Sequence, residues 1–131
     1  MMLDYDESAP FRLRPLEYRK KKFAEITQNN PDKIPIIFET SPKSKLLKGL
    51  NLKFTAKRTM KFSKIIENYR KWAKLESSNS IFFHCQKSKT IQPNASVDEI
   101  YEKSKSPEDG FLYIECCEID AWGSWTLLSE E

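Results

Sequence analysis

The sequence predicts a single domain of the α+β class, on three observations. The chain has 131 residues, 39% of them hydrophobic and 31% charged, as expected for one globular unit with its own core. Apolar residues recur at helical spacing in some segments and form short, strand-length runs in others. These segments follow one another in the order helix, strand, strand, helix, strand, helix, strand.

The first predicted elements are an arm and a helix. Residues 1–11 are acidic and are expected to form a loose or short helical arm in front of the domain. Leu16, Phe23 and Ile26 then fall on one face at helical spacing, and the turn-forming residues 29–32 end that helix.

A strand hairpin and a second helix come next. Residues 33–40 predict a strand in which Pro35 marks an edge position or the strand start, and residues 52–56 predict its hairpin partner. Residues 61–74 form the clearest element, an amphipathic helix with a wide apolar stripe.

The last elements complete the layout. Residues 81–85 predict a short strand, Ser96 and Glu99 are spaced as a capping box that starts a third helix, and residues 111–117 predict a core strand. A hairpin followed by a helix and two more strands is the layout of a β-grasp sheet, here with an additional N-terminal helical region.

Charge divides the chain into two halves. Residues 12–74 hold 18 Lys and Arg against 5 Asp and Glu, whereas residues 75–131 hold 4 against 11. The basic half predicts an acidic partner. A nucleic acid is not expected, because the chain carries no recognisable docking motif and most of its aromatic residues stand at core spacing.

Neither an enzyme, a metal site nor a cofactor is predicted. The chain has a single His, no Cys-x-x-Cys pair and no glycine-rich phosphate loop. Cys116 and Cys117 are adjacent in a predicted strand, so they point to opposite faces. A Cys–His pair assembled across strands is the alternative that these residues leave open. Three Cys without an export signal predict a cytosolic protein.

Gly123 is the most informative residue near the C-terminus. It follows the last strand in a chain with only three Gly, and residues 124–131 are too few for another element. A glycine on an extended tail suits conjugation chemistry, because it can thread a narrow channel and its carbonyl is open to close approach. An ordinary loop glycine before a frayed end is the other interpretation.

Two motifs and a glycine pair are specific enough to indicate a family. Residues Asn30 to Glu39 read NPDKIPIIFE, residues Glu108 to Ile114 read EDGFLYI, and Trp122-Gly123 is an aromatic-glycine pair. They resemble the Tyr-Pro-Asp-Arg-Val-Pro-Val-Ile-Val-Glu, the Asp-Glu-Asp-Gly-Phe-Leu-Tyr-Val and the aromatic-glycine pair of the ubiquitin-like autophagy modifiers (autophagy-related protein eight, and in animals the microtubule-associated light chains and GABA-receptor-associated proteins). The resemblance runs from about residue 10 to 123 and implies a ubiquitin-like domain over residues 12–123.

The resemblance implies conjugation through Gly123. A dedicated cysteine protease would cut the Gly123–Ser124 bond and remove the tail, residues 124–131. Activating and conjugating enzymes of the autophagy pathway would then pass the new carboxylate to the amine of phosphatidylethanolamine. The cytoplasmic protein would thereby become attached to the autophagosome membrane.

The resemblance also implies that short aromatic-x-x-aliphatic peptide motifs of cargo receptors add a strand beside the second β-strand. The residues that would line the aromatic pocket are Ile26, Pro35, Ile37, Lys53, Thr55 and Phe111. Those that would line the aliphatic pocket are Phe54, Ala56, Met60 and Ile65.

This chain departs from the family at five of the positions concerned. Thr55 and Ala56 stand where larger aliphatics are usual, so we expect both pockets to be roomier or shallower. The remaining departures are Asn68 and Trp72, in place of Leu and Arg, and Lys22, in place of a frequent acidic residue.

Two other functions are weighed. Ala121-Trp122-Gly123 resembles the ending of a sister modifier (autophagy-related protein twelve), which is joined to a protein lysine. The N-terminal helical region and the Asp-Gly-Phe-Leu-Tyr motif favour the lipid-linked type. The second alternative is a β-grasp adaptor that binds peptides and is never processed.

Overall fold

The structure is a computed structural model, and it describes residues 4–5, 11–40, 52–76, 80–85 and 89–119. One six-stranded sheet, in the order β1-β3-β2-β6-β4-β5, organises this part of the chain. The strands are β1 (Asp4–Tyr5), β2 (Lys33–Thr40), β3 (Leu52–Lys57), β4 (Ser80–Cys85), β5 (Lys89–Thr90) and β6 (Leu112–Ile119). The helices are η1 (Phe11–Leu13), α1 (Leu16–Asn29), α2 (Phe62–Trp72) and α3 (Val97–Ser104).

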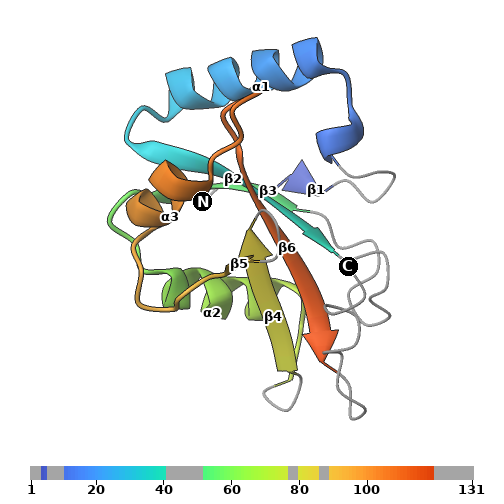
Figure 1. Cartoon of the computed structure of the whole chain (residues 1–131), viewed down its shortest axis with the longest axis vertical. Helices are drawn as coiled ribbons and strands as arrows, with labels where there is room; N and C mark the ends of the chain where they lie inside the picture. The colour runs from blue at the N-terminus through green and yellow to red at the C-terminus, as the bar shows by residue number, and fades with distance from the viewer. Residues whose placement is uncertain (1–3, 6–10, 41–51, 77–79, 86–88, 120–131) are drawn as a thin grey trace.

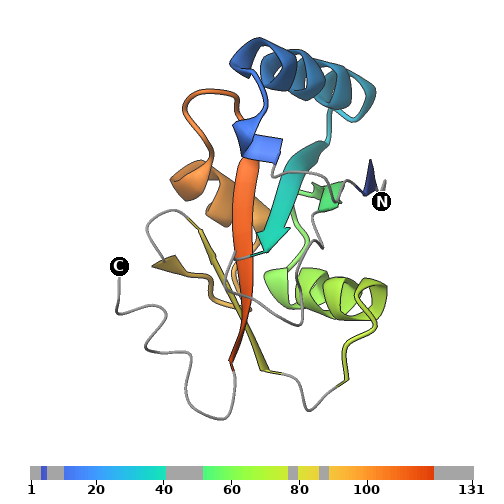
Figure 2. The same ribbon diagram turned by 90° about the vertical axis from the view of Figure 1, so that its right-hand side faces the viewer.

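The strand pairing confirms the β-grasp layout. β2 and β3 form the predicted antiparallel pair, with Ile37 opposite Lys53. β2 also pairs in parallel with β6, and β6 pairs antiparallel with β4. The strands run between α1 and α2 in both views of the molecule (Figures 1 and 2).

The main core lies between the sheet and helices α2 and α3. The apolar stripe predicted for residues 61–74 forms as expected, and its Phe62, Ile65 and Tyr69 are buried. Helix α3 begins at the predicted capping box, in which the Ser96 hydroxyl accepts from the Glu99 amide at 3.2 Å. The core therefore depends on segments whose periodicity is strongest in the sequence.

A smaller apolar cluster lies on the opposite face of the sheet, beneath α1. Phe11, Ile37 and Phe111 are buried there, with Phe23 and Ile26 of α1 packed against them. No residue of α1 is fully buried. This face is therefore covered more lightly than the face packed against α2 and α3.

The N-terminal arm differs from the prediction. We expected a loose or helical arm over residues 1–11, but Asp4–Tyr5 form strand β1 against β3. Phe11, the last residue of that range, begins η1. A strand of two residues carries no period-2 pattern, so the sequence gives no signal for β1 or for the equally short β5.

Pro35 also differs in part from the prediction. It stands near the start of β2, which is one of the two positions expected for it, but β2 lies inside the sheet between β3 and β6. Pairing with β6 begins at the next residue, Ile36. Pro35 thus precedes the stretch of β2 that is hydrogen-bonded on both sides.

Candidate functional site

A cavity of about 180 Å³ opens between α1 and β3. Its lining includes five of the six residues predicted for an aromatic pocket: Ile26, Pro35, Lys53, Thr55 and Phe111. The sixth, Ile37, is buried in the cluster below and does not line the space. We call this cavity the α1–β3 groove, and it brings together residues from α1, β2, β3 and the start of β6.

Packed aromatic rings fix the floor of the α1–β3 groove. The Phe111 ring meets Phe11 edge to face, with centroids 5.1 Å apart, and meets Phe23 at 5.4 Å. The Lys53 ammonium lies 5.1 Å from the centre of the Phe11 ring, within the range of a cation–π contact. The groove is therefore apolar at its base and carries a positive charge at its β3 wall.

The α1 side adds polar residues that sequence reasoning did not assign to the pocket. Lys22, Glu25, Asn29 and Asn30 line the groove along with Ile26. Lys22 was singled out only as a departure from the family pattern. The helical period could have found three of them, because Lys22, Asn29 and Asn30 stand three or four residues from Ile26.

The residues predicted for an aliphatic pocket do not gather in the same way. A pocket of only about 10 Å³ is lined by Phe54 and Ile65, and neither Ala56 nor Met60 reaches it. Asn68 and Trp72, two of the departures, complete this lining together with Phe38, Leu52 and Tyr69. A space of this size holds at most one water molecule, so the second pocket is almost filled.

Phe54, which the resemblance places in the aliphatic pocket, belongs to the core and also lines the α1–β3 groove. It is only 5% exposed, and its ring stacks on Phe38 with centroids 5.2 Å apart. The reason is geometric, because alternate residues of β3 face the main core and Phe54 stands at one of those positions.

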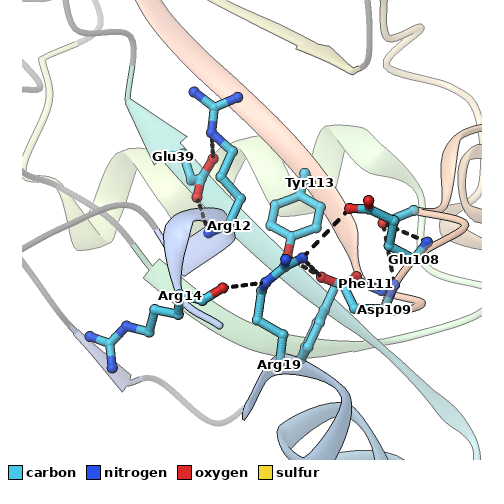
Figure 3. A network of polar contacts seen from close by, with 9 residues as sticks. Arg12, Arg14, Arg19, Glu39, Glu108, Asp109, Phe111 and Tyr113 are labelled. Atoms are coloured by element: carbon cyan, nitrogen blue, oxygen red, sulfur yellow. Dashed lines mark hydrogen bonds and ion pairs between the residues drawn. The ribbon is translucent and has the colours of Figure 1, made fainter. Parts of the chain in front are cut away.

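A buried polar network joins α1 to the start of β6 (Figure 3). The Arg19 guanidinium donates to Asp109 Oδ2 at 2.7 Å, and the Tyr113 hydroxyl donates to the same oxygen at 2.5 Å. Asp109 Oδ1 accepts from the Phe111 amide at 2.9 Å. The pKa of Tyr113 is raised, mainly because the hydroxyl is buried and secondly because it donates this hydrogen bond to Asp109. The network holds α1 in place above the groove floor.

Gly110 explains part of the Asp-Gly-Phe-Leu-Tyr motif. Its φ of +88° lies in the region that residues with a Cβ rarely adopt. A Cβ there would stand 2.8 Å from the ring of Phe23. The glycine thus allows α1 to pack closely on the turn before β6.

A second polar contact fixes the chain ahead of α1. Arg12 donates from its backbone amide and its side chain to Glu39, at 3.1 and 3.2 Å (Figure 3). Burial is the main cause that raises the pKa of Glu39, and the Arg12 charge opposes it. This contact anchors η1, and with it Phe11, over the end of β2.

The remaining chemistry-bearing residues form no catalytic or metal-binding group in the part of the chain that the structure describes. No cluster of three or more His, Cys, Asp or Glu side chains could hold a metal ion there. Burial raises the pKa of the Cys85 thiol, which is the opposite of what a nucleophilic cysteine needs. His84 is buried, with its Nε2 3.5 Å from Glu115.

Comparison with known proteins assigns the chain to a family. The family model described as "Autophagy protein Atg8 ubiquitin like" matches residues 18–123, which is most of the chain. The chain belongs to the Atg8 family. It is 32% identical over 111 residues to "Autophagy-related protein 8A" of Oryza sativa, in both the indica and the japonica subspecies, covering 84% of this chain and 91% of the relative.

A solved Atg8 structure supports the same fold. The crystal structure of Trypanosoma brucei ATG8 superposes with a TM-score of 0.71 at 25% identity, covering 82% of this chain and 91% of that one. Atg8-family proteins are ubiquitin-like proteins of autophagy and are not themselves enzymes. Within the described residues of this Atg8-family protein, no helix is long and apolar enough to span a membrane.

Gly123 and the tail that follows it lie outside the described residues. Their roles therefore depend on the family match, which ends at residue 123, and on the chemistry of glycine.

Proposed function

We propose that this Atg8-family protein is cleaved after Gly123 and conjugated through it to phosphatidylethanolamine on autophagosomal membranes. Membership of the family and a family match that ends at Gly123 support this proposal. The protein would supply the carboxylate, while a processing protease and the activating and conjugating enzymes would supply the catalysis. It would change from a cytoplasmic to a membrane-attached form.

We propose further that the α1–β3 groove receives the aromatic side chain of a short peptide from a cargo receptor or adaptor. The observation that carries this proposal is that five of the six predicted residues, from four separate elements, line one cavity. Among the described residues, no strand lies beside the outer edge of β3 from Phe54 to Lys57. A peptide could therefore add there by main-chain hydrogen bonds.

The geometry of the two pockets also favours a particular peptide. The α1–β3 groove offers about 180 Å³, whereas the pocket beside Trp72 offers about 10 Å³. The aromatic residue would therefore provide most of the buried area, with the aliphatic residue lying on a nearly flat surface. Lys22 and Lys53 favour acidic residues next to the aromatic one.

The conjugation proposal is tested by intact mass measurement of the protein from its own cells, beside a Gly123→Ala variant. We expect the wild-type protein to lose residues 124–131 and to gain a lipid mass under starvation. Both changes should be absent from the variant. Leu128→Ala, in the tail that the protease would remove, serves as the control for a general effect of altering this end of the chain.

Other outcomes separate the alternatives. An adduct of protein size would favour the sister modifier, whose ending Trp122-Gly123 resembles. An unchanged chain of 131 residues would contradict conjugation and leave an unprocessed peptide-binding adaptor.

A further inference from the structure

The chain places its own strand β1 on the edge of β3 that borders the α1–β3 groove. Asp4 stands opposite Lys53 and Tyr5 opposite Leu52, in antiparallel register. Lys53 lines the groove and Leu52 lines the small pocket beside Trp72. We propose that Asp4–Tyr5 act as a built-in competitor that must leave β3 before a partner strand can add in full. This inference rests on the proposed docking function.

The edge of a strand accommodates one neighbour at a time. The backbone N–H and C=O of one strand residue point to the same side, so successive residues of β3 direct these groups alternately toward β2 and outward. At Leu52 and Lys53, β1 takes the outward position, since β2 already pairs with these two residues from the other side. A peptide crossing from the α1–β3 groove toward the pocket beside Trp72 would need the same backbone groups.

Charge favours this intramolecular pairing. Residues 1–11 contain three acidic residues and no basic one. The register sets acidic Asp4 opposite basic Lys53, and opposite charges at facing positions stabilise an antiparallel pair. The arm therefore offers β3 the same kind of acidic segment that the basic groove favours in a partner.

The pairing is short enough to be displaced. Within the described part of the chain, only Asp4 and Tyr5 pair with this edge of β3, and no strand covers it from Phe54 to Lys57. When the binding-competent state is only partly populated, the apparent dissociation constant rises by the inverse of its population. A competitor that occupies the edge most of the time would weaken peptide binding by a few-fold to about tenfold.

The test compares peptide affinity in the full chain and in a Tyr5→Pro variant. Proline lacks the N–H that a strand uses, and this substitution leaves the net charge unchanged. Ser8→Pro is the matched control, because it introduces the same residue in the arm and leaves Asp4 and Tyr5 unchanged. The probe is a fluorescein-labelled synthetic peptide with a Trp-x-x-Leu core and Asp and Glu beside the Trp, followed by fluorescence anisotropy.

We expect Tyr5→Pro to bind the probe about three- to tenfold more tightly than both the full chain and Ser8→Pro. A chain lacking residues 1–7 keeps the buried Phe11 and should bind at least as tightly as Tyr5→Pro. An acetylated peptide of residues 1–8 should compete with the probe for this truncated chain.

The outcomes distinguish this inference from the function on which it rests. Equal affinity in the full chain, Tyr5→Pro and the truncated chain would overturn the competitor and leave the docking function standing. Failure of all the variants to bind would overturn the docking function and the competitor with it. Of the Leu52 and Lys53 amides, the one that faces β1 should exchange its hydrogen faster in Tyr5→Pro, and unchanged exchange at both would overturn the pairing itself.

Discussion

The two faces of the sheet are held by different kinds of contact. On the face covered by α2 and α3, 18 buried residues of the described chain form one continuous core. On the face covered by α1, three buried apolar residues are supplemented by the Arg19–Asp109–Tyr113 network and the Arg12–Glu39 contact. The first face is closely filled, whereas the second leaves the α1–β3 groove open.

This difference separates stability from binding. Burial of apolar area is the largest favourable contribution to folding, so the α2 and α3 face accounts for most of the stability. A directional polar network can hold a helix at a fixed height without filling the space beneath it. The α1 face is thereby able to keep an apolar cavity beside a strand edge, and this is the arrangement that peptide recognition by strand addition needs.

The largest expected effect comes from a matched pair of substitutions in β2. Ile36 and Ile37 are adjacent, chemically identical and each 1% exposed, but they face the main core and the α1 face respectively. We expect Ile36→Ala to lower the free energy of unfolding by about 4 kcal/mol and Ile37→Ala by about 2 kcal/mol. Urea denaturation measures both, and equal losses would show that the two faces are packed equally well.

The next effect tests whether the polar network holds α1. Asp109→Ala removes the acceptor of three hydrogen bonds and leaves Arg19 without its closest carboxylate. We expect a loss of about 3 kcal/mol in the free energy of unfolding. Glu108→Ala is the control, since its side chain is 67% exposed and 3.9 Å from Arg19, and it should cost under about 0.5 kcal/mol.

A smaller effect concerns binding at the α1 face. Lys22→Glu reverses a charge that lines the groove, whereas Lys21→Glu makes the same change at an exposed neighbour that does not line it. We expect Lys22→Glu to weaken binding of the acidic Trp-x-x-Leu peptide about three- to fivefold, which is under about 1 kcal/mol. Lys21→Glu should change the affinity little. Equal weakening by both variants, measured by fluorescence anisotropy, would point to overall charge rather than to the groove.

The smallest effect is a pH dependence at Glu39. Because burial raises its pKa in the folded state, Glu39 contributes stability that is complete below its unfolded pKa and is lost as pH rises through the folded pKa. Relative to Glu39→Gln, the wild-type protein should therefore become less stable as pH rises from about 4 toward neutral. Urea denaturation at several pH values checks this sign, with Glu102→Gln, at an exposed side chain, as the control for loss of a charge.

Sequence reasoning worked best where one element sufficed. The α2 stripe, the capping box at Ser96 and the β2–β3 hairpin all formed as predicted, because each depends on local spacing. Sequence reasoning did less well where a residue's environment depends on contacts between different elements. Phe54, which the resemblance places in a docking pocket, is also a core residue, and Arg19, one of four consecutive basic residues, pairs with the buried Asp109.

The sequence by itself determined the class of fold, because each helix or strand buries the face that its own periodicity makes apolar. Its short motifs indicated the family, and the resemblance to that family implied the five residues that line the α1–β3 groove. Only the tertiary structure decided that Trp72 and Phe54 nearly fill the second pocket, that Asp109 ties α1 to β6, and that Asp4–Tyr5 lie on β3. These contacts join residues far apart in the chain, so their existence depends on packing and strand register, which no local pattern encodes.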